Sequence, residues 1–281
     1  MYEAGGDRLS CGGEGIPLQH CAKLNSGELR YMTTKQSYND YVNDQTFMDD
    51  YAAYQTKYAT TIRESDRVIL QLVAGLCQRA TKPLALIDIG CSTGNLLLHL
   101  KNAGLPLSLS GGEMALSVLE QCESNLELSG IEFHVVNALD INRRQAFDIA
   151  IVNAVFYLFS PEEFTQSLAS IYDCLKPGGS CVVFDFFHPY EQDLSITELS
   201  KTHEAGITLH MRPFSQVEAL SKQIGFTTVT FQPFEIPIDL PRPAALNDIR
   251  SHTVKAESGV RLLFRGALYQ PWCHLTLTKG E

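Results

Sequence analysis

One acidic residue and two glycines, in the segment Asp88-Ile89-Gly90-Cys91-Ser92-Thr93-Gly94, have the spacing of a ligand-binding turn. The apolar residues before Asp88 predict a buried strand, and the leucine-rich stretch from Leu96 predicts a helix. A glycine turn between a strand and a helix can hold a nucleotide-like ligand, because glycine allows a tight turn and a close approach to the backbone. The spacing is neither G-x-G-x-x-G nor G-x-x-x-x-G-K-[ST], and the turn has no Lys or Arg for a phosphate. We therefore expect a nucleoside ligand with little negative charge.

The elements around this turn alternate between strand and helix. Strands are predicted over 84–89, 105–110, 131–136, 147–153, 180–186, 227–234 and 273–279, and helices over 63–79, 95–103, 115–128, 161–175 and 214–224. Residues 176–179 are expected to form a turn, and 260–264 a further strand-like run inside a long connection. This alternation predicts an α/β fold with a doubly wound parallel sheet covered by helices on both faces.

Composition limits the class of protein. The chain has 281 residues, 44% of them apolar, which is enough for a sizeable core, and a formal net charge of −10. Nucleic-acid binding usually needs a basic face, so this charge disfavours DNA or RNA as the substrate. The eight cysteines form no C-x-x-C pair, so neither a zinc ribbon nor a disulfide framework is indicated, and no metal is expected. No signal core or membrane span is apparent, which favours a reducing cytoplasm.

Five motifs in order then resemble one family, the class I S-adenosylmethionine-dependent methyltransferases, in particular the small-molecule branch. The Asp88–Gly94 turn resembles the family's D/E-x-G-x-G-x-G, with Ser92 in place of the middle glycine. The other four are Gly112-Glu113-Met114, Asn137-Ala138, Leu175-Lys176-Pro177-Gly178-Gly179 and Gly225-Phe226. The family usually has Asp where this chain has Asn137. The resemblance covers about residues 84–234 and implies a Rossmann-like sheet of seven strands, with the last strand, 273–279, antiparallel to the rest.

The resemblance implies S-adenosyl-L-methionine as cofactor. Glu113 would accept the ribose hydroxyls, the amide of Asn137 would pair with the adenine amino group, and Asp88 would orient the turn or, through water, the ligand's ammonium. The cofactor-binding residues expected are Asp88, Gly90, Cys91, Ser92, Gly94, Glu113, Met114, Asn137, Ala138, Asn153, Arg63 and Tyr58. Structural roles remain open for some of them: Glu113 as a charge at a helix start, and Asn137 as a cap of a turn.

The segment before the first strand is expected to be an N-terminal extension with a helical lid, residues 1–80, followed by the methyltransferase domain, residues 81–281. Family members often fold an N-terminal helix over the cofactor, so Tyr31, Tyr38 and Tyr58 are candidate lid residues and Arg63 a candidate partner of the methionine carboxylate. Core packing is the alternative for the aromatic residues. Insertions at about 190–212 and 237–270 are expected to build the acceptor pocket.

Two residues past the ends of strands are candidates for catalysis. His188, after the fifth strand, could take a proton from an acceptor hydroxyl or amine, and Tyr157, after the fourth, could orient the acceptor. The alternative for His188 is an ordinary loop histidine held by Pro189. Asn153 begins no N-P-P-Y-type motif, which argues against methylation of a nucleobase amino group by that route.

The sequence thus predicts methyl transfer to the oxygen, nitrogen or carbon of a small molecule. Two alternatives stay open: a protein or RNA methyltransferase, and a non-catalytic module that binds the cofactor. The aromatic N-terminal region and residues 260–264 could also form a homodimer surface.

Overall fold

The computed structural model describes residues 55, 58–78, 80–200, 203–242, 244, 251–266 and 268–281. All of them belong to one compact unit, residues 36–281. Tyr31, Tyr38 and the predicted extension over 1–30 lie outside the described residues. Within the described part, no helix is both long and apolar enough to cross a lipid bilayer.

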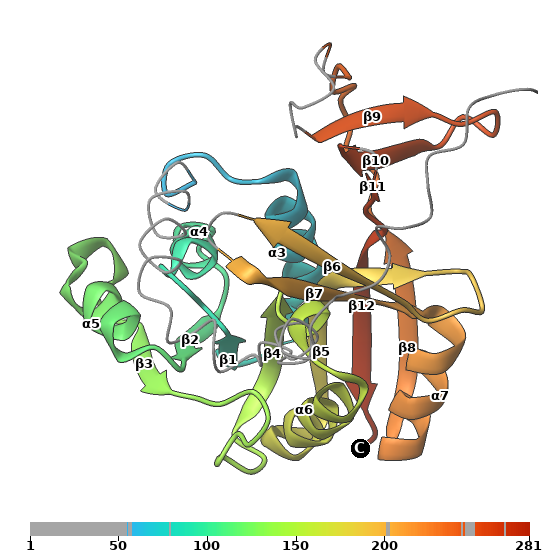
Figure 1. The fold of residues 1–281 in the computed structure, drawn as a ribbon. Coiled ribbons are helices and arrows are strands. Elements are labelled where there is room, and N and C mark those ends of the chain that lie inside the picture. Colours follow the sequence, from blue (N-terminus) through green and yellow to red (C-terminus); the bar gives the residue numbers. More distant parts are fainter. Residues whose placement is uncertain are drawn as a thin grey trace, which may run out of the picture. The chain divides into compact units, whose positions relative to one another are not determined.

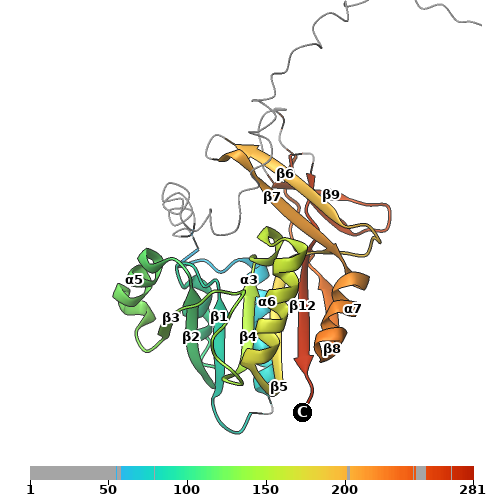
Figure 2. The same cartoon turned by 60° about the horizontal axis from the view of Figure 1, so that its bottom comes forward.

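A seven-stranded sheet forms the centre of this unit (Figures 1 and 2). Its strand order is β3-β2-β1-β4-β5-β12-β8, and β12 runs antiparallel to both of its neighbours. The strands are β1 (Leu84–Ile89), β2 (Leu107–Glu113), β3 (Glu132–Val135), β4 (Phe147–Asn153), β5 (Leu175–His188), β8 (Phe226–Pro233) and β12 (Trp272–Lys279). The predicted fold class, with the last strand antiparallel, is confirmed.

Helices cover both faces of the sheet (Figure 2). One face packs against α3 (Glu64–Cys77) and α4 (Asn95–Asn102), and the other against α6 (Pro161–Cys174) and α7 (Phe214–Ile224). A fifth helix, α5 (Leu116–Ser124), contacts β2 and β3. The start of α6 follows from its sequence, because Ser160 and Glu163 form a capping box and Pro161 begins the helix.

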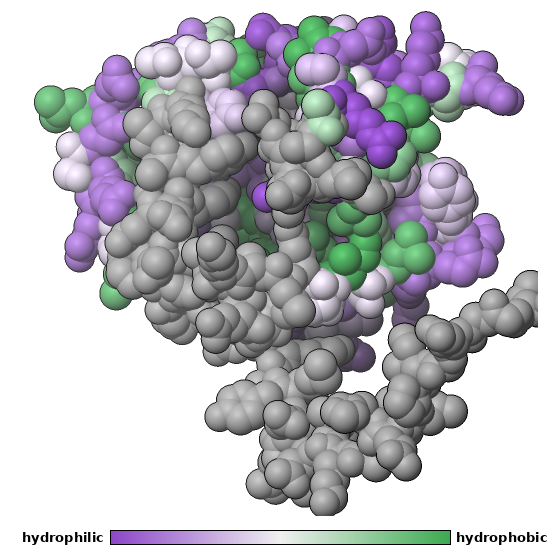
Figure 3. Space-filling model, turned by 45° about the horizontal axis from the view of Figure 1, so that its top comes forward, coloured by the Kyte–Doolittle hydropathy of each residue, from purple (hydrophilic) through white to green (hydrophobic). Residues whose placement is uncertain are grey.

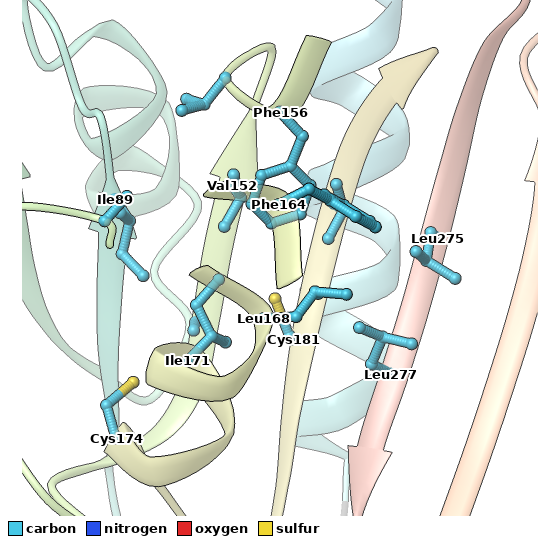
Figure 4. Close-up of a cluster of buried hydrophobic side chains, with 14 of the residues drawn as sticks. Ile89, Val152, Phe156, Phe164, Leu168, Ile171, Cys174, Cys181, Leu275 and Leu277 are labelled. Atoms are coloured by element: carbon cyan, nitrogen blue, oxygen red, sulfur yellow. The ribbon is translucent and has the colours of Figure 1, made fainter. Parts of the chain in front are cut away.

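Alternating side chains of each strand enter two separate hydrophobic layers. On β1, Ile87 and Ile89 lie in the layer beneath α6 and α7, which Figure 4 shows in part, whereas Leu86 lies in the layer beneath α3 and α4. By the same alternation Asp88 faces α3. An acidic side chain therefore ends the strand on the α3 side of an otherwise apolar layer.

Several boundaries differ from the sequence-based expectations, three of them by the way in which residues pair or cap. β2 continues to Glu113 rather than ending at Ser110, because it pairs with β3 over its last four residues. The helix expected over 115–128 ends at Ser124, where the side chain of Asn125 caps a separate 3-10 turn, Leu126–Leu128. The turn expected at 176–179 lies within β5, where pairing with β4 shifts in register.

The segment after β5 forms a hairpin, although the sequence predicted only a polar stretch there. Its strands are β6 (Leu194–Ser200) and β7 (His203–Pro213), in which apolar and polar residues alternate, and the end of β7 pairs with the end of β5. A second sheet of three short strands, β9 (Ser251–Lys255), β10 (Arg261–Arg265) and β11 (Leu268–Tyr269), precedes β12. Both expected insertions therefore contain strands.

Candidate active site

The turn between β1 and α4 has the backbone conformation that its glycines predicted. Gly90 and Gly94 have φ angles of +75° and +76°, and Ser92, between them, has φ +48°. A side chain at Gly90 would place its Cβ 2.8 Å from a methyl group of Val155. The amides of Gly90 and Cys91 both donate to the carbonyl of Gly112, at 2.7 and 3.1 Å. A left-handed Ser92 is a strained conformation of the kind that functional turns retain.

Glu113 ends β2 beside this turn and is buried. Its Oε2 accepts from the Ser92 amide at 3.2 Å and its Oε1 from the Met114 amide at 2.7 Å. A carboxylate has about four lone-pair positions, so acceptor capacity remains for ligand hydroxyls. The placement of Glu113 fits the expected ribose contact, and Met114 packs against the core next to it.

Asp88 is buried at the end of β1, and its Oδ1 has no hydrogen-bond partner among the described residues. Burial, and then the charges of Asp66 and Glu113, raise the pKa of Asp88 to about 8. On the opposite side of the turn, the amide of Asn153 donates to Asp66 Oδ1 at 3.0 Å. The structure thus adds Asp66, on α3, to the expected group of Asp88, Glu113 and Asn153.

Tyr58 and Arg63 lie over the start of α4. The guanidinium of Arg63 stacks 4.1 Å above the Tyr58 ring and donates to Gln55. Asn95 donates to the Gln55 carbonyl at 2.8 Å, and the His99 ring contacts the Tyr58 carbonyl at 3.2 Å. These contacts place both residues at the same turn, where the sequence predicted a lid.

Asn137 follows β3 and shapes its own turn. Its side-chain oxygen accepts from the Leu139 amide at 2.9 Å, which is the turn-capping role left open as an alternative. Ala138 is buried beside it in the core. The adenine contact expected of this pair stays a prediction.

The two candidate catalytic residues lie at the same edge of the sheet. His188 is fully buried, its Nε2 lies 3.2 Å from the Met211 carbonyl, and its Nδ1 has no partner among the described residues. A carbonyl only accepts, so Nε2 carries the proton in the neutral ring and Nδ1 is the free acceptor. Tyr157 is half-buried and lies 5.4 Å from the ring centre of Phe186. Their catalytic roles stay predictions.

Two buried charged residues that the sequence analysis did not identify, Asp185 and Arg212, hold the loop that carries Tyr157, the short helix η4 (Phe156–Leu158). Asp185 accepts from the amides of Val155 and Phe156 at 3.1 and 2.7 Å. Arg212, from β7, donates to the Phe156 carbonyl at 3.0 Å. Burial raises the pKa of Asp185 to about 6 and lowers that of Arg212 to about 10. The hairpin is therefore attached to the loop by charged contacts.

Aromatic residues from three segments form a wall beside that loop. The Trp272 ring stacks on Phe184 at 4.6 Å, lies 4.1 Å from Phe186 and meets the edge of Tyr157 at 6.1 Å. Trp272 and Tyr157 are half-buried. The Phe184 carbonyl accepts from the amide of Ala154, next to Asn153, so Phe184 lies beside the end of β4. On the face in Figure 3, hydrophobic side chains reach the surface between polar ones.

Comparison with known proteins is consistent with this geometry. Residues 86–179 match the family described as methyltransferase domain. This segment is similar to the class I S-adenosylmethionine-dependent methyltransferases. The residues at the turn fit the cofactor of that family, S-adenosylmethionine: Glu113 retains acceptor capacity for hydroxyls, and the buried oxygen of Asp88 lacks a donor among the described residues.

The chain is similar to two curated proteins. It is 25% identical over 165 residues to the ubiquinone/menaquinone biosynthesis C-methyltransferase UbiE of Desulfotalea psychrophila, and the match covers 58% of this chain and 65% of that protein. It is also 28% identical over 142 residues to carboxy-S-adenosyl-L-methionine synthase of Shewanella piezotolerans. That match covers 48% of this chain and 58% of the synthase. The chain therefore spans less than two thirds of the length of each.

The fold is also that of a solved methyltransferase. The crystal structure of Burkholderia thailandensis 1,6-didemethyltoxoflavin-N1-methyltransferase, with its acceptor and S-adenosylhomocysteine bound, superposes with a TM-score of 0.52 at 14% identity. The match covers 85% of this chain and 88% of the other chain. At that identity the likeness concerns the fold alone.

Proposed function

We propose that this chain transfers the methyl group of S-adenosylmethionine to a small molecule with a flat apolar portion. The observation that carries the proposal is the aromatic wall of Phe184, Phe186, Trp272 and Tyr157. It lies beside the end of β4, and its Trp272 and Tyr157 rings are half-buried. Aromatic side chains bind planar apolar rings by stacking and by edge contacts. The relatives whose names include small acceptors support the same class.

The residues of the turn would hold the cofactor. Glu113 would take the ribose hydroxyls, and the backbone from Gly90 to Gly94 would lie against the amino-acid portion. When bound, S-adenosylmethionine supplies a methyl group already activated by its positive sulfur. The protein then mainly has to orient the acceptor and exclude water.

The wall would orient the acceptor. Tyr157 is attached to the domain through the loop that Asp185 and Arg212 hold, so its ring position is set by buried contacts. His188 offers an unprotonated Nδ1 for an acceptor hydroxyl that reaches it. A carbon or amine acceptor with an accessible lone pair would need no such base.

The direct test combines binding and transfer with the full chain. Calorimetry should show that S-adenosylhomocysteine binds, and a labelled methyl group should pass to members of a panel of phenols, quinols and aromatic amines. Peptides and transfer RNA serve as competing acceptors. Labelling of peptide or RNA alone would overturn the small-molecule proposal, and cofactor binding without transfer to any acceptor would favour a non-catalytic module.

A further inference from the structure

Three carboxyl groups lie around the turn that follows β1. Asp66, Asp88 and Glu113 are 3%, 2% and 8% exposed. Asp88 lies close enough for the charges of the other two to raise its pKa. Taking several carboxylates out of water at one place is unfavourable unless donors or cations face them.

The protein supplies too few donors for this group. Glu113 accepts from three backbone amides and Asp66 from the amide of Asn153, but Oδ1 of Asp88 is buried with no partner among the described residues. None of the ion pairs among the described residues includes any of the three acids. The site is therefore short of a positively charged donor.

An ammonium group would be a positively charged donor of the kind that these acids lack. The amino-acid end of S-adenosylmethionine carries an ammonium beside a carboxylate. Arg63, three residues before Asp66, is a cation whose charge acts on Asp66 and stabilises its ionised form. Acids next to one arginine match the two charges of a zwitterion.

The positions of the acids agree with that ligand. Asp66 is in the first turn of α3, Asp88 is the last residue but one of β1, and Asn153 ends β4 next to β1 in the sheet. All three lie at the carboxyl edge beside Gly90. Asp66 also lies on the buried stripe of α3 with Ile69 and Val73, where an unpaired acid is unusual for packing alone.

We propose that Asp66, held by Asn153, completes with Asp88 a two-carboxylate subsite for the ammonium of the cofactor's amino-acid end. The inference rests on the proposed cofactor site. It adds to that site a residue from α3, outside the five sequence motifs.

Two ligands separate this role from a structural one. S-Adenosylhomocysteine carries the ammonium, whereas 5′-methylthioadenosine has the same nucleoside and lacks the amino-acid end. Asp66→Asn should weaken S-adenosylhomocysteine binding about 10-fold or more, the loss of a charge-assisted hydrogen bond, and change 5′-methylthioadenosine binding less than about twofold. Asn153→Ala should act in the same direction through Asp66. Glu64→Gln, in the same helical turn but paired with Arg67 at the surface, is the matched control.

The outcomes of calorimetry on the full chain distinguish the failures. If Asp66→Asn lowers the affinity for both ligands by the same factor, Asp66 is a structural residue and the inference is overturned. Unchanged affinity for both ligands would also overturn it, while cofactor binding itself stands. If the unaltered protein binds neither ligand, the proposed function fails first, and the ammonium subsite with it.

Discussion

The backbone amide of Ser92 donates to Oε2 of Glu113 across 3.2 Å, joining the turn after β1 to the end of β2. One carboxylate therefore holds a residue in the left-handed conformation, and the same carboxylate is predicted to accept the ribose hydroxyls. We expect ligand binding and turn geometry to be coupled through this contact.

Replacing Glu113 tests that coupling. Glu113→Gln keeps the size of the side chain but turns one of its two acceptor oxygens into a donor group. We expect at least about 10-fold weaker S-adenosylhomocysteine binding and about 1–2 kcal/mol lower unfolding free energy. Calorimetry and urea denaturation measure the two effects. Glu132→Gln, exposed on the neighbouring strand β3, is the control, and an unchanged affinity in Glu113→Gln would refute the ribose assignment.

Trp272 provides a test of the acceptor wall. Trp272→Ala removes the ring that contacts Phe184, Phe186 and Tyr157. Because it lies outside the cofactor turn, we expect KM for an aromatic acceptor to rise about 10-fold while the affinity for S-adenosylhomocysteine stays within about twofold. Trp272→Phe should retain part of the acceptor affinity. Equal losses of acceptor and cofactor affinity would show that Trp272 only supports the fold.

Asp88 should make the unfolding free energy of the ligand-free protein depend on pH. Its pKa is about 8 in the folded protein against an ordinary 3.8, so the folded state keeps a proton that the unfolded state loses between these values. Stability therefore falls as pH rises through this window, by on the order of 1 kcal/mol per pH unit. Urea denaturation at pH 5.5, 6.5 and 7.5 measures the slope. Asp88→Asn should flatten it, and an identical slope in the variant would contradict the assignment.

Arg212 should be important for stability. Arg212→Met removes the donor to the buried carbonyls of Phe156 and Phe159, and it removes the positive charge that favours the ionised form of the buried Asp185. We expect a loss of about 3–5 kcal/mol in unfolding free energy. Arg265→Met, an exposed arginine on β10, is the comparison, and a loss no greater than that variant's would show that Arg212 is dispensable.

Local sequence patterns determined most of the secondary structure of the central domain. Leu84–Ile89 and Phe147–Asn153 were predicted with the bounds that the structure shows, because short apolar runs end there at glycine or polar residues. The turn glycines, Glu113 and the antiparallel last strand followed from motif order. The hairpin of β6 and β7 was not predicted, because the alternation of apolar and polar residues in Leu194–Ser200 is short.

Only the tertiary structure decided which distant residues share the site. Asp66 meets Asn153, which is 87 positions away, because the first turn of α3 lies at the end of β4. An acid on the apolar stripe of α3 was the one local signal for it. Trp272 joins Phe184 because β12 inserts antiparallel beside β5. Periodicity and turn chemistry act over a few residues, whereas these contacts depend on strand order and register, which no local pattern encodes.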